Sequence, residues 1–363
     1  MAEISWPSLL TGLIAGQDLA PDTARWAMQQ ILRGDATPAQ TAGFVVGLRM
    51  KGEQPAEVRA LTDVMLEFAH LVPRPESLPV VLDVVGTGGD GSRSVNISTM
   101  AALVCAAAGA PVIKHGNRAA SSQAGAADVL EQVGVTIALS PEAVARCAQD
   151  VGIGFCFAPA HHPALRHAAP TRRELGVATV FNILGPLTNP GLANASLAGC
   201  ANERLAPLVA AVLHERGVSA LVVRGTDGLD EISTCAPTRV WDATGDAVTE
   251  TEVAPADLGV DTVHAELLRG GDPARNAELL VKVLDPVIAD DDPDARAVAA
   301  IRDAVTVNAA AALVAFDAAC GIREDGELAD RIRARMPRAR EVLTSGAALA
   351  TLREWSKLSA ELA

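Results

Sequence analysis

Residues 80–91 read VVLDVVGTGGDG, an apolar run with β-branched residues that leads directly into a glycine-rich turn. The apolar segment after this turn predicts a helix over residues 96–108, ended by Gly109. Residues 111–113 then begin a second short strand. A strand, a glycine turn, a helix and a further strand indicate an α/β domain with a mainly parallel sheet.

The chain after this unit continues the same alternation. Further strands are predicted over residues 153–157 and 220–224, and a helix over residues 201–216 lies between them. Residues 285–294 are rich in aspartate and contain two prolines, so we expect a solvated loop without chemistry there.

The first 72 residues read instead as helices. Thr37 is a good N-cap, with Pro38 at the first helical position and Gln40 completing a capping box. Another helix is expected to begin at Pro55. The Pro-Arg-Pro segment at 73–75 then reads as a linker or hinge.

Composition narrows the classes of protein to consider. The 363 residues are 49% hydrophobic and 20% charged, which is typical of a globular chain long enough for more than one domain. The net charge is −14, and the sequence shows no basic stripe of the kind that nucleic-acid-binding proteins have. No apolar run reaches about 18 residues, and no signal peptide is evident. The six cysteines form no C-x-x-C pair, so we expect free thiols and a cytoplasmic protein.

The glycine turn matches the G-x-G-x-x-G pattern of dinucleotide-binding folds at residues 86–91. That fold requires an acidic residue about 20 residues further on. The corresponding position here is basic, at Lys114, and the helix begins several residues after the last glycine. A Walker A motif is also excluded, because no Gly-Lys-Ser/Thr follows.

Although neither the dinucleotide-binding motif nor the Walker A motif fits, the glycine turn still predicts an anion-binding site. Glycines allow backbone N–H groups to approach an anion, and the following helix start offers further unpaired N–H groups. Asn96, Ser98 and Thr99 add side-chain donors there, although ordinary helix capping would explain any one of them. Residues 114–122 read KHGNRAASS and follow the second strand. A basic loop of this kind is usually an ordinary surface loop. Because it follows a strand beside the glycine turn, it predicts a polyphosphate-binding site here.

Asp230 and Glu231 follow the strand predicted at 220–224. Adjacent carboxylates beside a phosphate site suggest Mg²⁺, which takes one or two protein carboxylates and completes its shell with phosphate oxygens and water. The alternatives are a solvated acidic turn and a glycosidase acid/base pair. In an extended segment adjacent side chains point to opposite faces, which argues against the glycosidase pair.

Residues 161–190 mix cations with proline and glycine. The histidines there, at positions 161, 162 and 167, lack the spacing of a zinc site and have no cysteine cluster beside them. Arg172 and Arg173, each taken singly, are equally compatible with an ordinary surface helix.

Together these segments resemble the anthranilate phosphoribosyltransferase family. The resemblance runs from about residue 5 to residue 355 and is specific as a combination, although each piece alone is not. Its stretches are DVVGTGGDG at 83–91, VNIST at 95–99, KHGNR at 114–118, GAAD at 125–128, RRELG at 172–176, FNILGPLTNP at 181–190 and GLDE at 228–231.

The resemblance implies a small all-helical domain beside a larger α/β domain of the nucleoside phosphorylase/phosphoribosyltransferase kind. The helical domain would comprise residues 1–75, with 163–195 returning to it, and the α/β domain residues 76–162 and 196–363. It also implies a homodimer joined through the helical domains. The implied reaction joins anthranilate to phosphoribosyl pyrophosphate (PRPP), giving phosphoribosyl-anthranilate and pyrophosphate in tryptophan biosynthesis.

The resemblance also implies roles for individual residues. Anthranilate would meet Gly86, Asn117 and Arg172, and Mg²⁺ would be held by Ser98, Asp230 and Glu231. No general base is assigned, because the amine of anthranilate is already a nucleophile; Lys114 and His115 are electrostatic or orienting candidates. The residues implied to hold PRPP are Gly86, Gly89, Asp90, Ser94, Asn96, Ile97, Ser98, Thr99, Lys114, His115, Gly116, Asn117, Arg118, Ala119, Ala120, Ser121, Ser122 and Ala126.

Three positions depart from the family pattern. Ala126 stands where relatives often have serine, Leu165 stands where they can have tyrosine, and residues 285–294 replace a shorter turn. Two related functions stay open: a nucleoside phosphorylase of similar architecture and a non-catalytic nucleic-acid-binding relative. The KHGNR stretch counts against the first, while the acidic charge and the Asp230–Glu231 pair count against the second.

Overall fold

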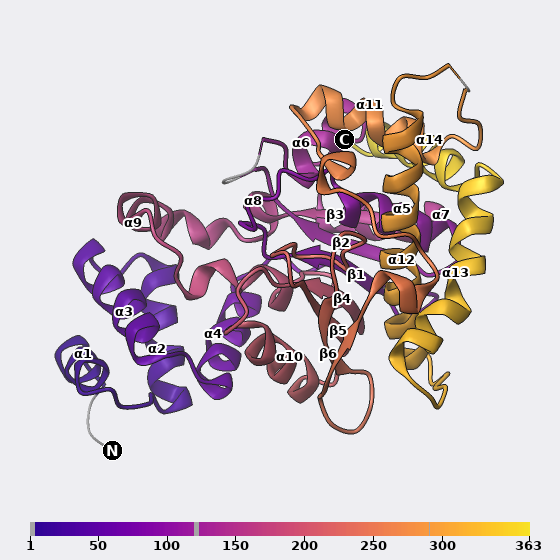
Figure 1. The fold of residues 1–363 in the computed structure, drawn as a ribbon. Helices are drawn as coiled ribbons and strands as arrows, with labels where there is room; N and C mark the ends of the chain where they lie inside the picture. Colours follow the sequence, from indigo (N-terminus) through magenta and orange to yellow (C-terminus); the bar gives the residue numbers. More distant parts are fainter. Residues whose placement is uncertain (1–3, 120–122, 290) are drawn as a thin grey trace.

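A small helical part and a larger α/β part make up the protein (Figure 1). The structure is a computed structural model that describes residues 4–119, 123–289 and 291–363. The helical part begins with α1 (Trp6–Ile14), α2 (Pro21–Arg33), α3 (Pro38–Lys51) and α4 (Pro55–Glu67). Three of these helices begin at proline, whose missing N–H costs nothing at the first helical position.

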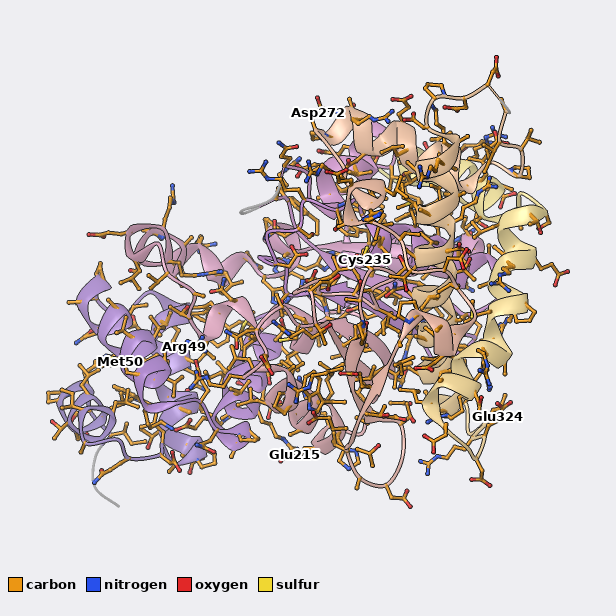
Figure 2. All side chains as sticks on the ribbon, in the orientation of Figure 1. Arg49, Met50, Glu215, Cys235, Asp272 and Glu324 are labelled. Atoms are coloured by element: carbon orange, nitrogen blue, oxygen red, sulfur yellow. The ribbon has the colours of Figure 1, made fainter. Side chains whose placement is uncertain are left out.

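The capping box predicted before α3 is confirmed. The Thr37 hydroxyl accepts the Gln40 N–H at 3.2 Å, and the Gln40 side chain accepts the Thr37 N–H at 2.9 Å. Figure 2 shows Met50, near the end of α3, on the side of the helical part away from the sheet.

A later stretch of chain returns to these helices. Its η1 turn packs against α2, and its α9 helix packs against α3. The predicted boundaries of this return, 163–195, stay a prediction. The elements of the stretch are α8 (Ala158–His161), η1 (Pro163–His167), α9 (Ala169–Leu175), η2 (Val180–Asn182) and η3 (Gly185–Leu187).

The α/β part is built on a seven-stranded sheet of order β3-β2-β1-β4-β5-β6-β7. The first five strands of that order are parallel and the last two are antiparallel. The mainly parallel sheet is therefore confirmed. Its strands are β1 (Leu82–Gly86), β2 (Val112–Gly116), β3 (Ile153–Phe157), β4 (Ala195–Gly199), β5 (Ser219–Gly225), β6 (Thr238–Ala243) and β7 (Thr249–Val253).

Two apolar cores lie on the two faces of this sheet. Val85 and Val222 face the core shared with α10 (Ala206–Glu215) and the helical part, and Val84 and Val223 face the other core. The helices on that second side are α5 (Ile97–Ala107), α6 (Ala126–Gln132), α7 (Pro141–Val151), α11 (Pro273–Leu284), α12 (Ala295–Ala319), α13 (Leu328–Thr344) and α14 (Ala347–Glu361). Two short turns, η4 (Pro255–Leu258) and η5 (Ala265–Leu268), complete the chain between β7 and α11.

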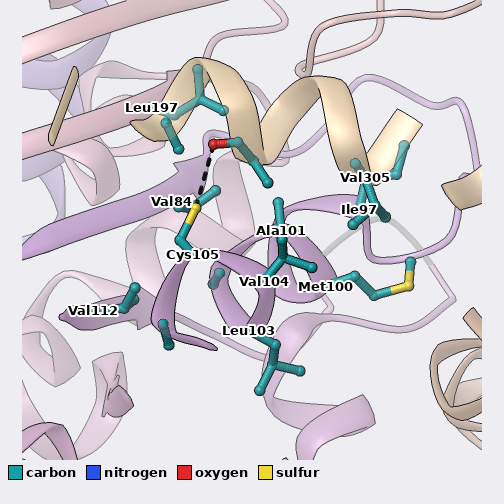
Figure 3. Close-up of a cluster of buried hydrophobic side chains, with 14 of the residues drawn as sticks. Val84, Ile97, Met100, Ala101, Leu103, Val104, Cys105, Val112, Leu197 and Val305 are labelled. Atoms are coloured by element: carbon teal, nitrogen blue, oxygen red, sulfur yellow. Dashed lines mark hydrogen bonds between the residues drawn. The ribbon is translucent and has the colours of Figure 1, made fainter. Parts of the chain in front are cut away.

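Helices α5 and α12 form the centre of this second core. Figure 3 shows α5 beneath α12, with the Cys105 thiol donating to the Ala309 carbonyl at 3.5 Å. By length and composition α12 could cross a membrane, but most of it is buried inside the protein, as a core helix is. All six cysteines are free thiols, as predicted.

The structure corrects several boundaries. The second strand extends to Gly116, so Lys114 and His115 lie within β2 and not in the loop after it. The helix predicted from residue 201 begins at Ala206. Strands β4, β6 and β7 were not predicted. Within the acidic stretch 285–294, Asp292 and Asp294 are not free in solvent, because they form ion pairs with Lys282.

Candidate functional site

A cavity of about 360 Å³ opens between the α/β part and the helical part, where β1, β2 and β3 end. In open α/β sheets ligands bind at these carboxyl ends, where the strand order reverses direction. The reversal here lies between β1 and β4. The predicted residues that line the cavity are Gly86, Gly89, Asp90, Ser94, Asn96, Ser98, Lys114, His115, Gly116, Asn117, Arg118, Ala119, Ala126, Arg172, Asp230 and Glu231.

Some predicted residues do not line it. The side chains of Ile97 and Thr99 are buried in the core, so only their backbone N–H groups, in the first turn of α5, could meet an anion. Ala120, Ser121 and Ser122 lie outside the described residues. Leu165, one of the departures from the family pattern, does line the cavity.

The glycine turn presents its backbone to this cavity. Gly88, Gly89 and Gly91 have φ values of 64°, 79° and 72°, which glycine adopts without steric cost. A Cβ atom at any of the three would meet no neighbouring atom, so the requirement is one of backbone conformation, not of space.

Asn96, at the start of α5, is held by its neighbours and does not cap its own helix. The Gly271 N–H donates to the Asn276 side chain at 2.7 Å, which fixes the orientation of the Asn276 amide. That amide donates to Asn96 Oδ1 at 2.9 Å, and Asn96 Nδ2 donates to the Ala124 carbonyl at 3.1 Å. Asn276 was missed by the sequence analysis, and its one signal was a buried amide on an otherwise apolar helix face.

The segment that carries Asp230 crosses the ends of β1 and β4 at very close range. The Gly88 N–H donates to Asp230 Oδ2 at 2.7 Å. A Cβ atom at Gly86 would overlap the Asp230 carboxylate, and one at Gly199 would overlap the Asp230 carbonyl oxygen. Glycine at these two strand ends is therefore required by space.

Three carboxylates gather beside the glycine turn. Burial is the main cause that raises the pKa of Asp230 to about 6 and the pKa of Glu231 well above its usual range, and the negative charge of Asp90 adds to both shifts. Asp90 Oδ2 and Glu231 Oε2 are buried without a hydrogen-bond partner. Among the described residues these carboxylates form no ion pair, and Lys114 is the cation that acts on Asp230 and Glu231. A bound cation would add positive charge to the cluster.

The donor set fits Mg²⁺ in particular. No group of three or more His, Cys, Asp or Glu side chains with the geometry of a metal site occurs among residues 4–119, 123–289 and 291–363. Mg²⁺ needs no such group, because it is usually held by one or two carboxylates together with substrate phosphates and water.

Lys114 is bonded to the first strand and acts electrostatically on Asp230 and Glu231. Its side chain is buried and donates to the Val84 carbonyl. Burial lowers the pKa of Lys114, while Asp83, Glu231 and Asp230 counter that shift. Asp83 also accepts the His115 N–H at 3.1 Å, so it holds the end of β2 from behind the cavity.

His115 is a neutral imidazole in this site. Burial is the main cause that lowers its pKa to about 3. Its Nδ1 lies 3.0 Å from the Gly185 carbonyl and must donate to it, which leaves Nε2 as an acceptor. Nε2 is buried and has no partner in the described residues. His115 can therefore orient a substrate N–H or O–H group, but it cannot donate a proton near neutral pH.

The two predicted arginines differ in their surroundings. Arg118 forms ion pairs with Asp128 and Glu131, so its guanidinium is already engaged. Arg172 instead stacks over the Phe181 ring at 5.1 Å and forms no ion pair among the described residues. Partial burial lowers the pKa of Arg172, and a half-buried guanidinium of this kind favours a carboxylate ligand.

Two family models match the chain. A model described as "Glycosyl transferase family, helical bundle domain" covers residues 7–69, and one described as "Glycosyl transferase family, a/b domain" covers residues 78–349. The anthranilate phosphoribosyltransferase of Saccharopolyspora erythraea is 50% identical over 358 residues, covering 99% of this chain and 97% of that protein. The corresponding protein of Salinispora arenicola is 51% identical, covering 99% and 98%.

The chain belongs to the anthranilate phosphoribosyltransferase family.

Solved structures agree with this membership. The anthranilate phosphoribosyltransferase of Thermus thermophilus matches with a TM-score of 0.84 and 38% identity, over 97% of this chain and 99% of that one. The Saccharomyces cerevisiae anthranilate phosphoribosyltransferase "in complex with PRPP and Mg" matches with a TM-score of 0.84 and 26% identity, over 99% of each chain. The fold expected of the family, a helical domain beside a mainly parallel α/β domain, is thus confirmed.

Replacing Gly199 with alanine tests the close approach of the Asp230 segment. Gly199→Ala should lower the free energy of unfolding by about 1–3 kcal/mol, because the new methyl group overlaps a backbone carbonyl that has to move. Denaturant unfolding followed by circular dichroism measures the change. Gly245→Ala is the control, since its nearest atom would lie 3.9 Å away; equal stability of the two variants would contradict the packing described here.

His162 gives a pH prediction for this family member. Its Nε2 donates to the Thr188 carbonyl at 2.9 Å, and burial is the main cause that lowers its pKa to about 4. The unfolded chain takes up this proton below its ordinary pKa of 6.5 and the folded chain does not, so stability present above pH 6.5 is lost as the pH falls toward 4.

His162→Gln keeps a donor for Thr188 but cannot titrate. Between pH 7 and pH 4 the parent should lose about 3 kcal/mol more stability than this variant, at about 1.4 kcal/mol for each pKa unit. Urea unfolding at several pH values measures the difference. The exposed His264→Gln serves as control and should follow the parent; a His162→Gln curve parallel to the parent's would refute the assignment.

Proposed function

We propose that this chain transfers the phosphoribosyl group of PRPP to the amine of anthranilate, giving N-(5-phosphoribosyl)anthranilate and pyrophosphate in tryptophan biosynthesis. The observation that carries the proposal is a cavity with two unlike sides. One side holds a glycine turn beside three carboxylates that form no ion pair within the described part of the chain, and the other holds Arg172 beside an aromatic ring. A polyphosphate with Mg²⁺ fits the first side, and an aromatic carboxylate fits the second.

PRPP would lie along the ends of β1 and β2. The N–H groups of the glycine turn and of the first turn of α5 would bind its phosphates. Lys114 would stabilise charge that develops on the departing pyrophosphate. Arg118 would have to leave Asp128 and Glu131 before it could contribute.

Mg²⁺ would be held by Asp230 and Glu231, with Ser98 beside them. When bound, the ion neutralises the pyrophosphate and stabilises it as a leaving group. Support comes from the unpartnered Glu231 Oε2 and from the yeast relative with PRPP and Mg. The Gly88 N–H keeps Asp230 Oδ2 directed at the glycine turn, where the phosphates would lie.

Anthranilate would enter from the helical side. Arg172 would pair with its carboxylate through two parallel hydrogen bonds, while Asn117 and the Gly86 backbone approach from the other wall. The anthranilate amine needs positioning more than deprotonation, and positioning can lower a barrier by about 7–11 kcal/mol. The Nε2 acceptor of His115 is suited to orienting an N–H group, which agrees with the absence of an assigned general base.

Loss of anthranilate fluorescence on incubation with PRPP and Mg²⁺ tests the reaction directly. Turnover with release of pyrophosphate is expected. Turnover of nucleosides with inorganic phosphate instead would favour the phosphorylase alternative, and binding of nucleic acid without any turnover would favour the non-catalytic one.

The metal assignment is tested by Asp230→Asn and Glu231→Gln. Both variants should need at least about tenfold more Mg²⁺ for half-maximal rate, because each removes one anionic oxygen donor from the pair. Circular dichroism confirms that the fold persists. Parental Mg²⁺ dependence in both variants would exclude the pair as ligands.

Anthranilate recognition is tested by two neighbouring arginines. Arg172→Lys should raise the apparent KM for anthranilate by about tenfold and leave that for PRPP nearly unchanged, since lysine cannot form the two parallel bonds. Arg173, which is exposed and does not line the cavity, is the matched control, and Arg173→Lys should change neither constant. If Arg173→Lys raised the KM for anthranilate and Arg172→Lys did not, Arg173 would be the residue that binds the carboxylate.

We also propose a cytoplasmic homodimer joined through the helical domain. Ile14 on α1 and Met50 on α3 are 86% and 82% exposed, and these two helices pack against each other. Light scattering after size-exclusion chromatography should show a dimer for the parent and a shift toward monomer for Met50→Glu. Val287→Glu, at a 73% exposed position of the α/β part, is the control; a monomeric parent would contradict the proposal.

A further inference from the structure

Asn308 is a polar residue buried in the apolar middle of α12, two positions after the buried Thr306. Asn308 is fully buried, and the residues on either side of it, from Val305 to Ala315, are almost all apolar and buried as well. Burying an amide costs about 1–3 kcal/mol unless its hydrogen bonds are replaced. A buried amide at this position therefore calls for a compensating set of partners.

Those partners lie on the segment that carries the carboxylate pair. The Ile232 N–H donates to Asn308 Oδ1 at 2.9 Å, and Asn308 Nδ2 donates to the Ile232 carbonyl at 2.9 Å. Nδ2 also donates to the Ala304 carbonyl at 2.9 Å. The amide thus binds both backbone groups of one residue, as a neighbouring strand would, and the backbone groups fix its orientation.

Ile232 follows Glu231 directly in a segment without regular secondary structure. Some nearby bonds of this segment are local: Asp227 accepts the Ser233 hydroxyl at 2.7 Å, and the Ser233 N–H donates to Thr238 at 2.9 Å. The Val263 N–H also donates to the Thr234 carbonyl at 3.0 Å. Asn308 reaches the segment from a different element, the rigid core helix α12. We propose that Asn308 is a positioning residue for the metal site, which fixes the backbone beside Glu231 so that Asp230 and Glu231 face the glycine turn together.

The proposal rests on the function proposed above, because it concerns how the Mg²⁺ carboxylates are held. Residues that orient metal ligands from behind commonly change metal affinity or activity by about 10–100-fold when they are replaced. A purely structural role for Asn308 makes a different prediction, since loss of core packing lowers stability without a selective effect on the metal.

The experiment compares Asn308→Asp, Asn308→Ala and Leu313→Ala. The aspartate keeps the size and the acceptor for the Ile232 N–H, but it has at most one proton to donate, whereas the amide donates to both the Ile232 and the Ala304 carbonyls. Leu313→Ala removes a fully buried side chain from the same helix, five residues away, and provides a stability-matched control. Affinity for Mn²⁺ in the presence of pyrophosphate is followed by the loss of the free-ion electron paramagnetic resonance signal, and thermal unfolding is recorded for each variant.

Both Asn308 variants should bind Mn²⁺ at least about tenfold more weakly than the parent, with the apparent KM for anthranilate little changed. Leu313→Ala should melt at a lower temperature and keep the parental Mn²⁺ affinity. If Asn308→Ala does not fold, Asn308→Asp decides alone.

If the folded Asn308 variants keep the parental Mn²⁺ affinity and Asp230→Asn weakens Mn²⁺ binding, the positioning role of Asn308 is wrong. Parental affinity in Asp230→Asn as well would instead overturn the metal site itself, so the two failures are distinguishable.

Discussion

The close approach of the Asp230 segment to the ends of β1 and β4 is the constraint on which the site depends. It needs glycine at positions 86 and 199, because any side chain there would occupy the space of Asp230. It places a carboxylate within hydrogen-bonding distance of the Gly88 N–H, inside the glycine turn. The Asp230–Glu231 pair and the glycine turn thereby lie in one site, although more than 140 residues separate them in sequence.

This arrangement brings negatively charged side chains close together in the site. Asp230 and Glu231 share a buried region beside the negative charge of Asp90, and the nearby cation Lys114 is itself bound to a carbonyl oxygen. In such surroundings carboxyl groups hold their protons to higher pH than they do in water. Under the proposed function, Mg²⁺ and the phosphates of PRPP balance each other's charge in this site, and neither should bind well alone.

Much of this site could be predicted from sequence because its chemistry lies in short contiguous stretches. The strand before Gly86, the donors after it and the Asp230–Glu231 pair each stand out from composition and spacing. The extent of β2 was wrong, because the hydrogen bonds of Lys114 and His115 to β3 depend on a neighbour distant in sequence. Strand β4, ASLAG, is short and built largely of small residues, and its burial on both faces is decided by tertiary packing alone.

The residues that sequence reasoning missed act through contacts between distant elements. Asn276 orients Asn96 from α11, and Asn308 binds Ile232 from α12, with about 180 and 76 residues between the partners. Neither residue belongs to a recognisable motif. The engagement of Arg118 by Asp128 and Glu131 is of the same kind, since a basic loop read from sequence gives no sign of which anion its arginine contacts.

Proton release on ligand binding tests the central claim most directly. Calorimetry of PRPP binding with Mg²⁺, in two buffers of different ionisation enthalpy, gives the number of protons released. Between pH 5 and pH 7 the parent should release more protons than Glu231→Gln, because burial raises the pKa of Glu231 and a bound cation would lower it again. Equal proton release in parent and variant, with equal affinity, would contradict the account.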